Sequence, residues 1–147
     1  MPTEPPSRLR RLASWQAGRV ATLGARMTAA RMPSEARTDF AVLAALTEFG
    51  DLSQADLGRH LALDRNNVNG VVTRLERAGD IARATDPVDR RRNVVTVTDA
   101  GAERFRELDA LAEAVQDELL APLDHEERER LRALLDKVLS AHPPLPA

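Results

Sequence analysis

The sequence has 147 residues, of which 43% are hydrophobic and 30% are charged, and its formal net charge is −2. These proportions fit one soluble domain with a hydrophobic core and exclude a disordered chain. No apolar run approaches the roughly 18–20 residues that cross a bilayer, and the first residues lack the apolar stretch of a secretory signal. We therefore expect a cytoplasmic protein without a membrane partner. The absence of cysteine excludes disulfides, cysteine-ligated zinc and thiol-based sensing.

The charge is unevenly distributed along the chain. Between Arg65 and Arg92, seven arginines stand against four acidic residues, whereas between Asp99 and Asp136 five arginines stand against twelve. Phosphate groups respond to the local field, so a basic segment can bind them even in a slightly acidic protein. The middle of the chain is therefore the expected place for a polyanionic partner.

Two helices are expected before the basic segment. The first runs from about residue 8 to 32, and Pro33 ends it. Its apolar residues fall on one stripe: Leu9, Leu12, Val20, Leu23 and Met27. The second begins with Thr38 as its N-cap and ends at Gly50.

Two shorter helices separated by a tight turn come next. Ser53, with Asp56 three residues later, begins the first in a pattern similar to a capping box. Asp64 caps the second, which stops at Gly79. Two helices joined by the turn at 61–63 are typical of a helix–turn–helix unit, whose second helix enters the major groove of DNA.

A β-hairpin is predicted directly after this unit. Residues 81–85 and 93–98 are rich in β-branched side chains and flank the sequence DPVDRRR. A hairpin after a helix–turn–helix defines a winged helix. The expected fold class is therefore mainly α with a small β-hairpin wing.

Two long helices complete the chain. Thr98 caps the first, which Pro122 ends, and Asp124 with Glu127 forms a capping box that opens the second, to about Ser140. Amphipathic terminal helices with little to cover in so short a chain favour a homodimer. The expected division is a DNA-binding lobe at 38–98, dimerisation helices at 8–32 and 99–140, and flexible tails at 1–7 and 141–147.

The helix that begins after Asp64 has two contrasting faces. Its core face carries Val68, Val71, Val72 and Leu75. Its outer face carries Asn66, Asn69, Gly70, Thr73 and Arg77, with Arg65, Asn67 and Arg74 on the flanks. Asparagine can bond adenine N6 and N7 together, threonine can contact a thymine methyl group, and arginine binds guanine or phosphate. We predict that this face contacts bases, with Ser53 and Gln54 of the preceding helix nearby.

Gly70 is the most informative residue of that outer face. A glycine in a helix interior costs about 1 kcal/mol relative to alanine. We expect it to allow close approach of the helix backbone to DNA. The alternative is a merely solvated polar face, and three asparagines within four positions, a poor helix composition, count against it.

The wing tip carries three consecutive arginines: Arg90, Arg91 and Arg92. Arginines on a hairpin tip can enter a narrow minor groove, where the negative potential is strongest. Asp89 can fix one of them through an ion pair. The alternative is a solvated charge run that keeps the hairpin soluble, and the preceding helix–turn–helix favours the DNA contact.

The segment DPVDRRRNVVTVTDAG resembles the wing signature of the MarR family of bacterial regulators, D-x-R-R, a β run, then L-T-x-x-G. The matching residues include Asp89, Arg90, Arg91, Thr98 and Gly101, with Val97 in place of the usual leucine. The segment SQADLGRHLALDRNNVNGVVTRLERAGDI is similar to the family's helix–turn–helix and its L-E-x-x-G-x-I/V ending. The resemblance extends from about residue 8 to 140.

This resemblance implies a triangular homodimer whose two recognition helices enter successive major grooves of a pseudo-palindromic operator in double-stranded DNA. It implies that Arg91 enters the minor groove and that the terminal helices form the dimer interface. Many members release DNA when a small, often aromatic, ligand binds between the dimer helices and the DNA-binding lobe. We therefore expect a transcriptional regulator that represses nearby genes.

A small-molecule site is a weaker prediction. Trp15 is the only tryptophan, and it could line an effector pocket with Arg11, Arg19 and Phe40, since arginine is a natural partner for a ligand carboxylate. The favoured alternative is that Trp15 packs in the dimer interface.

Enzyme and metal signatures are missing from the sequence. His60, His125 and His142 are far apart, and there is no H-x-x-H, Gly-rich phosphate loop or G-x-S-x-G. We expect no metal, no cofactor and no enzymatic activity. Two rival functions are a winged-helix protein–protein module without DNA binding and an enzyme built on helices. The asparagine face and the arginine wing count against the first, and the missing catalytic constellation counts against the second.

Overall fold

The computed structural model describes residues 4–143. The helices are α1 (Ser7–Arg10), α2 (Ala13–Arg31), α3 (Ser34–Phe49), α4 (Gln54–Leu61), α5 (Arg65–Ala78), α6 (Asp99–Leu119) and α7 (His125–Ser140). The strands are β1 (Leu52–Ser53), β2 (Ile81–Thr85) and β3 (Asn93–Val97). The predicted fold class, mainly helical with a small β wing, is confirmed.

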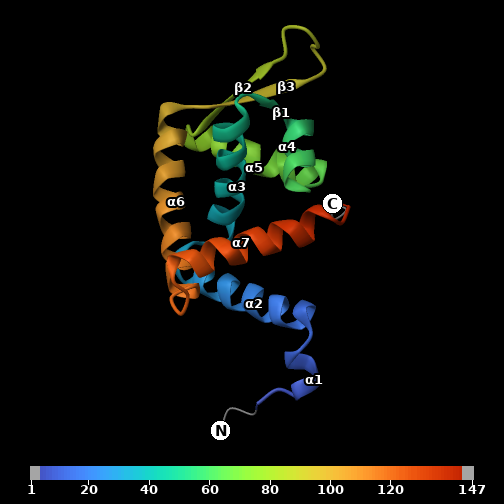
Figure 1. Ribbon diagram of the computed structural model, residues 1–147. Helices are drawn as coiled ribbons and strands as arrows, with labels where there is room; N and C mark the ends of the chain where they lie inside the picture. The colour runs from blue at the N-terminus through green and yellow to red at the C-terminus, as the bar shows by residue number, and fades with distance from the viewer. Residues whose placement is uncertain (1–3, 144–147) are drawn as a thin grey trace.

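One lobe holds the hydrophobic core. Helices α3, α4 and α5 and the sheet pack against one another, and α6 runs alongside α3 (Figure 1). The fully buried side chains include Val42, Leu43, Leu46, Leu57, Leu75 and Val95. All four apolar residues predicted for the inner face of α5 are buried, so the opposite face of this helix points away from the core.

The sheet has three antiparallel strands in the order β1-β3-β2. Strand β1 was not expected, because two residues are too short to show a period. It pairs Leu52 with Val95, while Arg83 of β2 lies opposite Val95 on the other side of β3. Ser53 ends β1 and caps α4, as expected, by accepting a hydrogen bond from the Asp56 N–H at 3.1 Å.

The start of α6 is tied to the end of α5. The Thr98 hydroxyl donates to the Gly79 carbonyl at 2.7 Å, and the Thr98 N–H donates to the Asp80 carbonyl at 3.0 Å. Gly101 lies so close that a Cβ atom there would overlap the Asp80 carbonyl oxygen. The T-x-x-G pattern therefore allows the first turn of α6 to pack directly on the chain that leaves the helix–turn–helix.

Two helix boundaries differ from the sequence expectation. The predicted helix at 8–32 is divided into α1 and α2, since Leu12 takes an extended conformation with φ −88° and ψ 117°. None of the α1 residues is buried, so no core contact holds it on the axis of α2. Thr38 is not an N-cap: α3 already begins at Ser34, because Ala36 belongs to the core and extends the helix by a turn.

The structure describes only part of each predicted tail, 1–7 and 141–147. Residues 1–3 and 144–147 lie outside the described residues, and α1 already begins at Ser7. At the other end, α7 closes at Ser140 as expected, after the predicted Asp124–Glu127 capping box. Within residues 4–143, no helix is long and apolar enough to span a bilayer.

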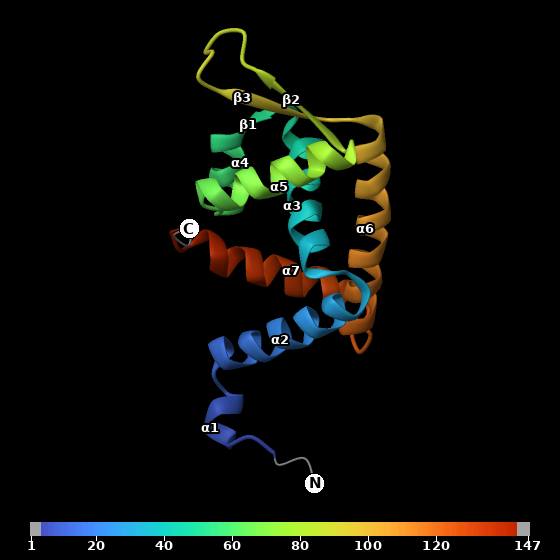
Figure 2. The same cartoon turned by 180° about the vertical axis from the view of Figure 1, so that it is seen from behind.

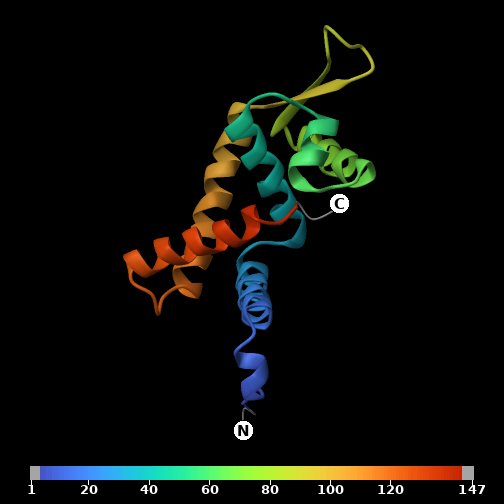
Figure 3. The same cartoon turned by 45° about the vertical axis from the view of Figure 1, so that its right-hand side comes forward.

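Helices α2 and α7 contribute no buried residue to the protomer. The wing projects from one end of the molecule, and α2 followed by α1 lies toward the other (Figure 2). Helices α1 and α2 lead away from the lobe (Figure 3). Large apolar side chains on these helices are exposed: Val20, Leu23, Leu134, Leu135, Val138 and Leu139. Two long helices thus present apolar surface that this chain does not cover.

Candidate nucleic-acid interface

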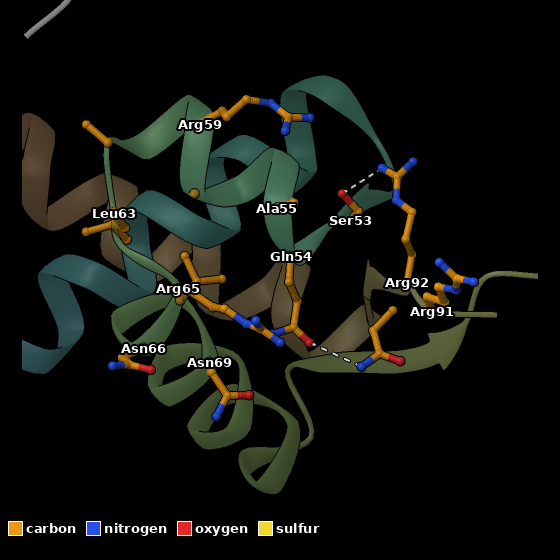
Figure 4. A pocket seen from close by; sticks show the side chains of 14 residues that line it. Ser53, Gln54, Ala55, Arg59, Leu63, Arg65, Asn66, Asn69, Arg91 and Arg92 are labelled. Carbon is orange, nitrogen blue, oxygen red and sulfur yellow. Dashed lines mark hydrogen bonds between the residues drawn. The ribbon is translucent and has the colours of Figure 1, made fainter. Parts of the chain in front are cut away.

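An open groove of about 980 Å³ lies between α4, α5 and the base of the wing (Figure 4). Its lining includes Ser53, Gln54, Arg59, Arg65, Asn66, Asn69, Arg91, Arg92 and Asn93. The fold therefore brings the predicted recognition helix and residues 91–93 of the predicted wing to one surface, although β2 lies between them along the chain.

The exposed face of α5 carries the residues expected to contact bases. Asn66, Asn69 and Gly70 are exposed, as are Arg65 and Arg77 on either end of the helix, while Thr73 is half-buried. The Asn67 side chain donates to the capping carboxylate of Asp64 at 2.6 Å, so it belongs to the helix N-terminus. A Cβ atom at Gly70 would meet no atom within 4 Å, so no contact inside the protomer requires glycine there.

Arg74 does not face the groove. Its Nε donates to the buried carboxylate of Asp39 at 3.2 Å, and its Nη2 forms an ion pair with the same group. Arg104 of α6 lies 2.9 Å from Asp39 and 3.0 Å from Asp80. The predicted DNA contact at Arg74 is replaced by an internal network that joins α3, α5 and α6.

Arg92 and Ser53 hold the wing to α4. The Arg92 guanidinium donates to the Ser53 hydroxyl at 2.9 Å (Figure 4). It also donates to the Asp56 carboxylate at 3.1 Å. The Ser53 hydroxyl hydrogen bond, followed by the nearby charges of Arg59 and Arg92, keeps the pKa of Asp56 below its ordinary value, against an opposing desolvation. Ser53 and Arg92, which were both predicted to contact DNA, are therefore hydrogen-bonded to each other.

Two aspartates of the wing tip accept hydrogen bonds from nearby backbone N–H groups. Asp86 accepts the Val88 N–H at 2.8 Å, and Asp89 accepts the Arg91 N–H at 3.0 Å. Asp89 thus orients the wing through the backbone and not through the expected ion pair with a guanidinium. Within the described residues, Arg90 and Arg91 have no side-chain partner and remain available to a ligand.

Arg83 is a residue that the sequence interpretation missed. Its guanidinium lies 3.0 Å from Glu76, 3.3 Å from the Gln54 side-chain oxygen and 3.4 Å from the Asn69 side-chain oxygen. Residues two apart in a strand lie on the same face of the sheet. Arg83 is two residues after Ile81, which is buried, so this spacing could have indicated that Arg83 points inward.

The residues proposed for an effector pocket are not brought together in the protomer. Phe40 is partly buried, stacks on Phe105 with ring centroids 5.6 Å apart and packs against the core, and its assignment to a ligand site stays a prediction. The Arg19 guanidinium lies 5.7 Å from the ring centre of Trp15 in α2, whereas Arg11 is the C-cap residue of α1. Among the described residues, no cluster of three acidic or histidine side chains could hold a metal ion.

Comparison with known proteins agrees with this geometry. The family model described as "MarR family" matches residues 36–92. The transcriptional repressor NicR of Pseudomonas putida is 29% identical over 109 residues, which cover 74% of this chain and 69% of NicR. The crystal structure of a probable transcriptional regulator from Pseudomonas aeruginosa is 33% identical, with a TM-score of 0.75 over 88% of this chain and 98% of that one.

A third relative is BpsR of Bordetella bronchiseptica, whose structure describes regulation of its DNA binding by 6-hydroxynicotinic acid. It is 28% identical, with a TM-score of 0.73 over 85% of this chain and 96% of that one.

The fold and the groove define a winged helix–turn–helix protein. The chain belongs to the MarR family of regulators, as its wing signature indicated. It is therefore a DNA-binding transcriptional regulator, of a family whose members act as dimers on duplex DNA.

Proposed function

We propose that two copies of this chain bind a pseudo-palindromic operator and repress nearby genes. The observation that carries this proposal is the groove, in which the exposed asparagines of α5 and the wing arginines face one surface. Each α5 enters a major groove, and each wing reaches the adjacent minor groove. We propose no enzymatic role, and we place the protein in the cytoplasm because its ligand is genomic DNA.

The role proposed for each interface residue depends on whether its side chain already has a partner within the described residues. Asn66 and Asn69 contact base edges, and Arg65 and Arg77 contact phosphates at the two ends of α5. Arg90 and Arg91 lie at the wing tip, with Arg91 in the minor groove. Ser53, Asp89 and Arg92 act as supports of the wing, and we remove Arg74 from the set.

The proposed dimer interface consists of the apolar faces of α2 and α7, with contributions from α6. These helices contain no fully buried residue in the protomer, and Val138 and Leu139 are 59% and 69% exposed. So much uncovered apolar surface on two long helices is typical of an interface and not of a monomer. Residues 8–32 and 99–140 then form the dimerisation part, and 38–98 the DNA-binding lobe.

The proposed signal for release from DNA is a small aromatic ligand. BpsR supports this proposal, because its DNA binding is regulated by 6-hydroxynicotinic acid. In this chain Arg19 lies over the Trp15 ring, and Arg11 comes shortly before it in the sequence; an aromatic ring and guanidinium groups suit an aromatic acid. The assignment of Trp15, Arg11 and Arg19 to this ligand is tested by titrating aromatic acids and following tryptophan fluorescence.

A mobility shift with DNA from upstream of the protein's own coding region tests the main proposal. We expect binding to this DNA at concentrations that leave random duplex free, and binding to random duplex only at low salt. Arg91→Ala should weaken binding to all sequences and reduce the salt slope by roughly one. Arg106→Ala, on the exposed surface of α6, is the matched control. No binding to any duplex at low salt would favour the rival protein–protein module.

A further inference from the structure

Arg83 lies behind the groove and contacts two amides that line it. Its side chain is 22% exposed, and it extends from β2 across the junction of α4 and α5. One guanidinium nitrogen donates to both Gln54 Oε1 and Asn69 Oδ1, and the other donates to Glu76. A single arginine thus holds side chains from both helices of the helix–turn–helix.

These contacts determine which end of each amide faces the groove. A guanidinium only donates, so the partner of Arg83 in each amide is the oxygen. The Gln54 oxygen also accepts from the Asn93 side chain at 3.5 Å. With both oxygens directed toward Arg83, the NH₂ groups of Asn69 and Gln54 are the ends left for a ligand in the groove.

The orientation has a consequence for base recognition. Bonding adenine N6 and N7 together requires both the oxygen and the NH₂ group of an asparagine. Guanine offers two acceptors, N7 and O6, whereas adenine offers N7 beside the donating N6 group, so a donor-only amide favours guanine over adenine. Asn66 has no such restraint within the described residues and keeps both ends of its amide.

We propose that Arg83 is a positioning residue that sets base specificity, making Asn69 a donor that selects guanine over adenine. This inference rests on the proposed binding of DNA by α5 and adds the base class at one position of each half-site. Arg83 does this without touching DNA, since it acts through the amide oxygens. The charge of Glu76 holds the guanidinium in place from the opposite side.

The experiment measures affinity for a panel of operators with every base substituted in turn. Asn69→Ala identifies the position that Asn69 contacts, where the wild type should prefer guanine over adenine by roughly fivefold or more. Arg83→Met removes the donors and frees the amide to turn. At that same position, and not at others, the preference against adenine should then disappear or reverse.

Arg90→Met is the matched control, because it removes an exposed wing arginine that holds no amide. It should weaken binding uniformly and reduce the salt slope by roughly one. If Arg83→Met behaves in the same way, Arg83 contacts phosphate and the inference is wrong. An unchanged base profile with a lowered melting temperature would also overturn it, whereas Arg83→Lys, which keeps a donor for the amide oxygens, should retain the wild-type preference.

A measurement without DNA separates this inference from the proposed function. In the free protein, Arg83→Met should shift the NMR signals of the Asn69 side-chain NH₂ group, whereas Arg90→Met should leave them unchanged. Unchanged signals in both variants would refute the contact itself. If the signals shift but the wild type binds no operator, the proposed function fails while the orientation by Arg83 stands.

Discussion

The guanidinium of Arg92 lies 3.1 Å from the carboxylate of Asp56, so the base of the wing is joined to the first turn of α4. The two residues are 36 positions apart in the chain. Arg59 forms a second ion pair with the same carboxylate. The wing of this protein is therefore held to the helix–turn–helix by a charged side chain that a sequence pattern would assign to DNA.

Asp56→Asn should weaken operator binding several-fold, as measured by mobility shift or fluorescence anisotropy. The reason is that the wing loses its attachment to α4 and must be ordered when DNA binds. Simple electrostatics predicts the opposite sign, because the substitution removes a negative charge near phosphates. Asp51→Asn, an exposed acidic residue just before β1, is the control for charge alone. Tighter binding by Asp56→Asn would show that Arg92 is released to contact DNA.

The stability that Asp56 provides should depend on pH in one direction. Its pKa in the folded protein lies below the ordinary value of 3.8, chiefly because of the hydrogen bond from Ser53. The ionised form is thus favoured by folding, so the contribution is complete above the ordinary pKa and is lost as the pH falls through the folded pKa. The difference in unfolding free energy between the wild type and Asp56→Asn should shrink in acid. A difference that grows in acid would contradict this assignment.

Asp39→Ala should destabilise the protein by about 3 kcal/mol in urea unfolding, the low end for breaking a buried ion pair. The Asp39 side chain is only 3% exposed, and its removal leaves Arg74 and Arg104 without their shared partner. The arginines are about one-third exposed and can regain water, which limits the loss. Glu103→Ala, which breaks an exposed pair on α6, should cost less than about 1 kcal/mol. Equal losses would argue against a structural network.

Val138→Asp should convert the dimer to monomer at micromolar concentration in sedimentation velocity. A charge in the centre of an apolar interface is costly to desolvate, and an interface of the obligate type buries upwards of about 2,000 Å². Val88→Asp is the matched control, because Val88 is 94% exposed between β2 and β3, and these strands lie apart from α7 in Figure 1. If both variants sediment like the wild-type dimer, α7 does not carry the interface.

Gly70→Ala should raise the unfolding free energy by about 1 kcal/mol, since alanine is the better helix former and nothing lies within 4 Å of its Cβ atom. Gly70→Leu should also leave the protein folded but should weaken operator binding strongly, because the side chain holds α5 away from the base edges. Comparison of the two variants separates bulk from helix propensity. Wild-type affinity in Gly70→Leu would show that this face does not approach DNA.

Short-range patterns determined the order of the elements. The caps at Ser53, Asp64, Thr98 and Asp124 each bond an N–H three residues later, so the signal and its effect lie within one turn. The inner face of α5 followed from the 3.6-residue period, and the wing motif identified the family. These features depend on neighbours in the sequence and could be predicted from it.

Only the tertiary structure determined which polar side chains are available to bind DNA and which are bound within the protein. Arg74 and Arg91 look alike in the sequence, but only Arg74 meets a buried carboxylate, 35 residues away at Asp39. Strand β1 forms because β3 lies beside it, and the orientation of Asn69 depends on Arg83, 14 residues later. A guanidinium binds whichever oxygen the packed helices and strands bring within reach, and that distance is set only when the core closes.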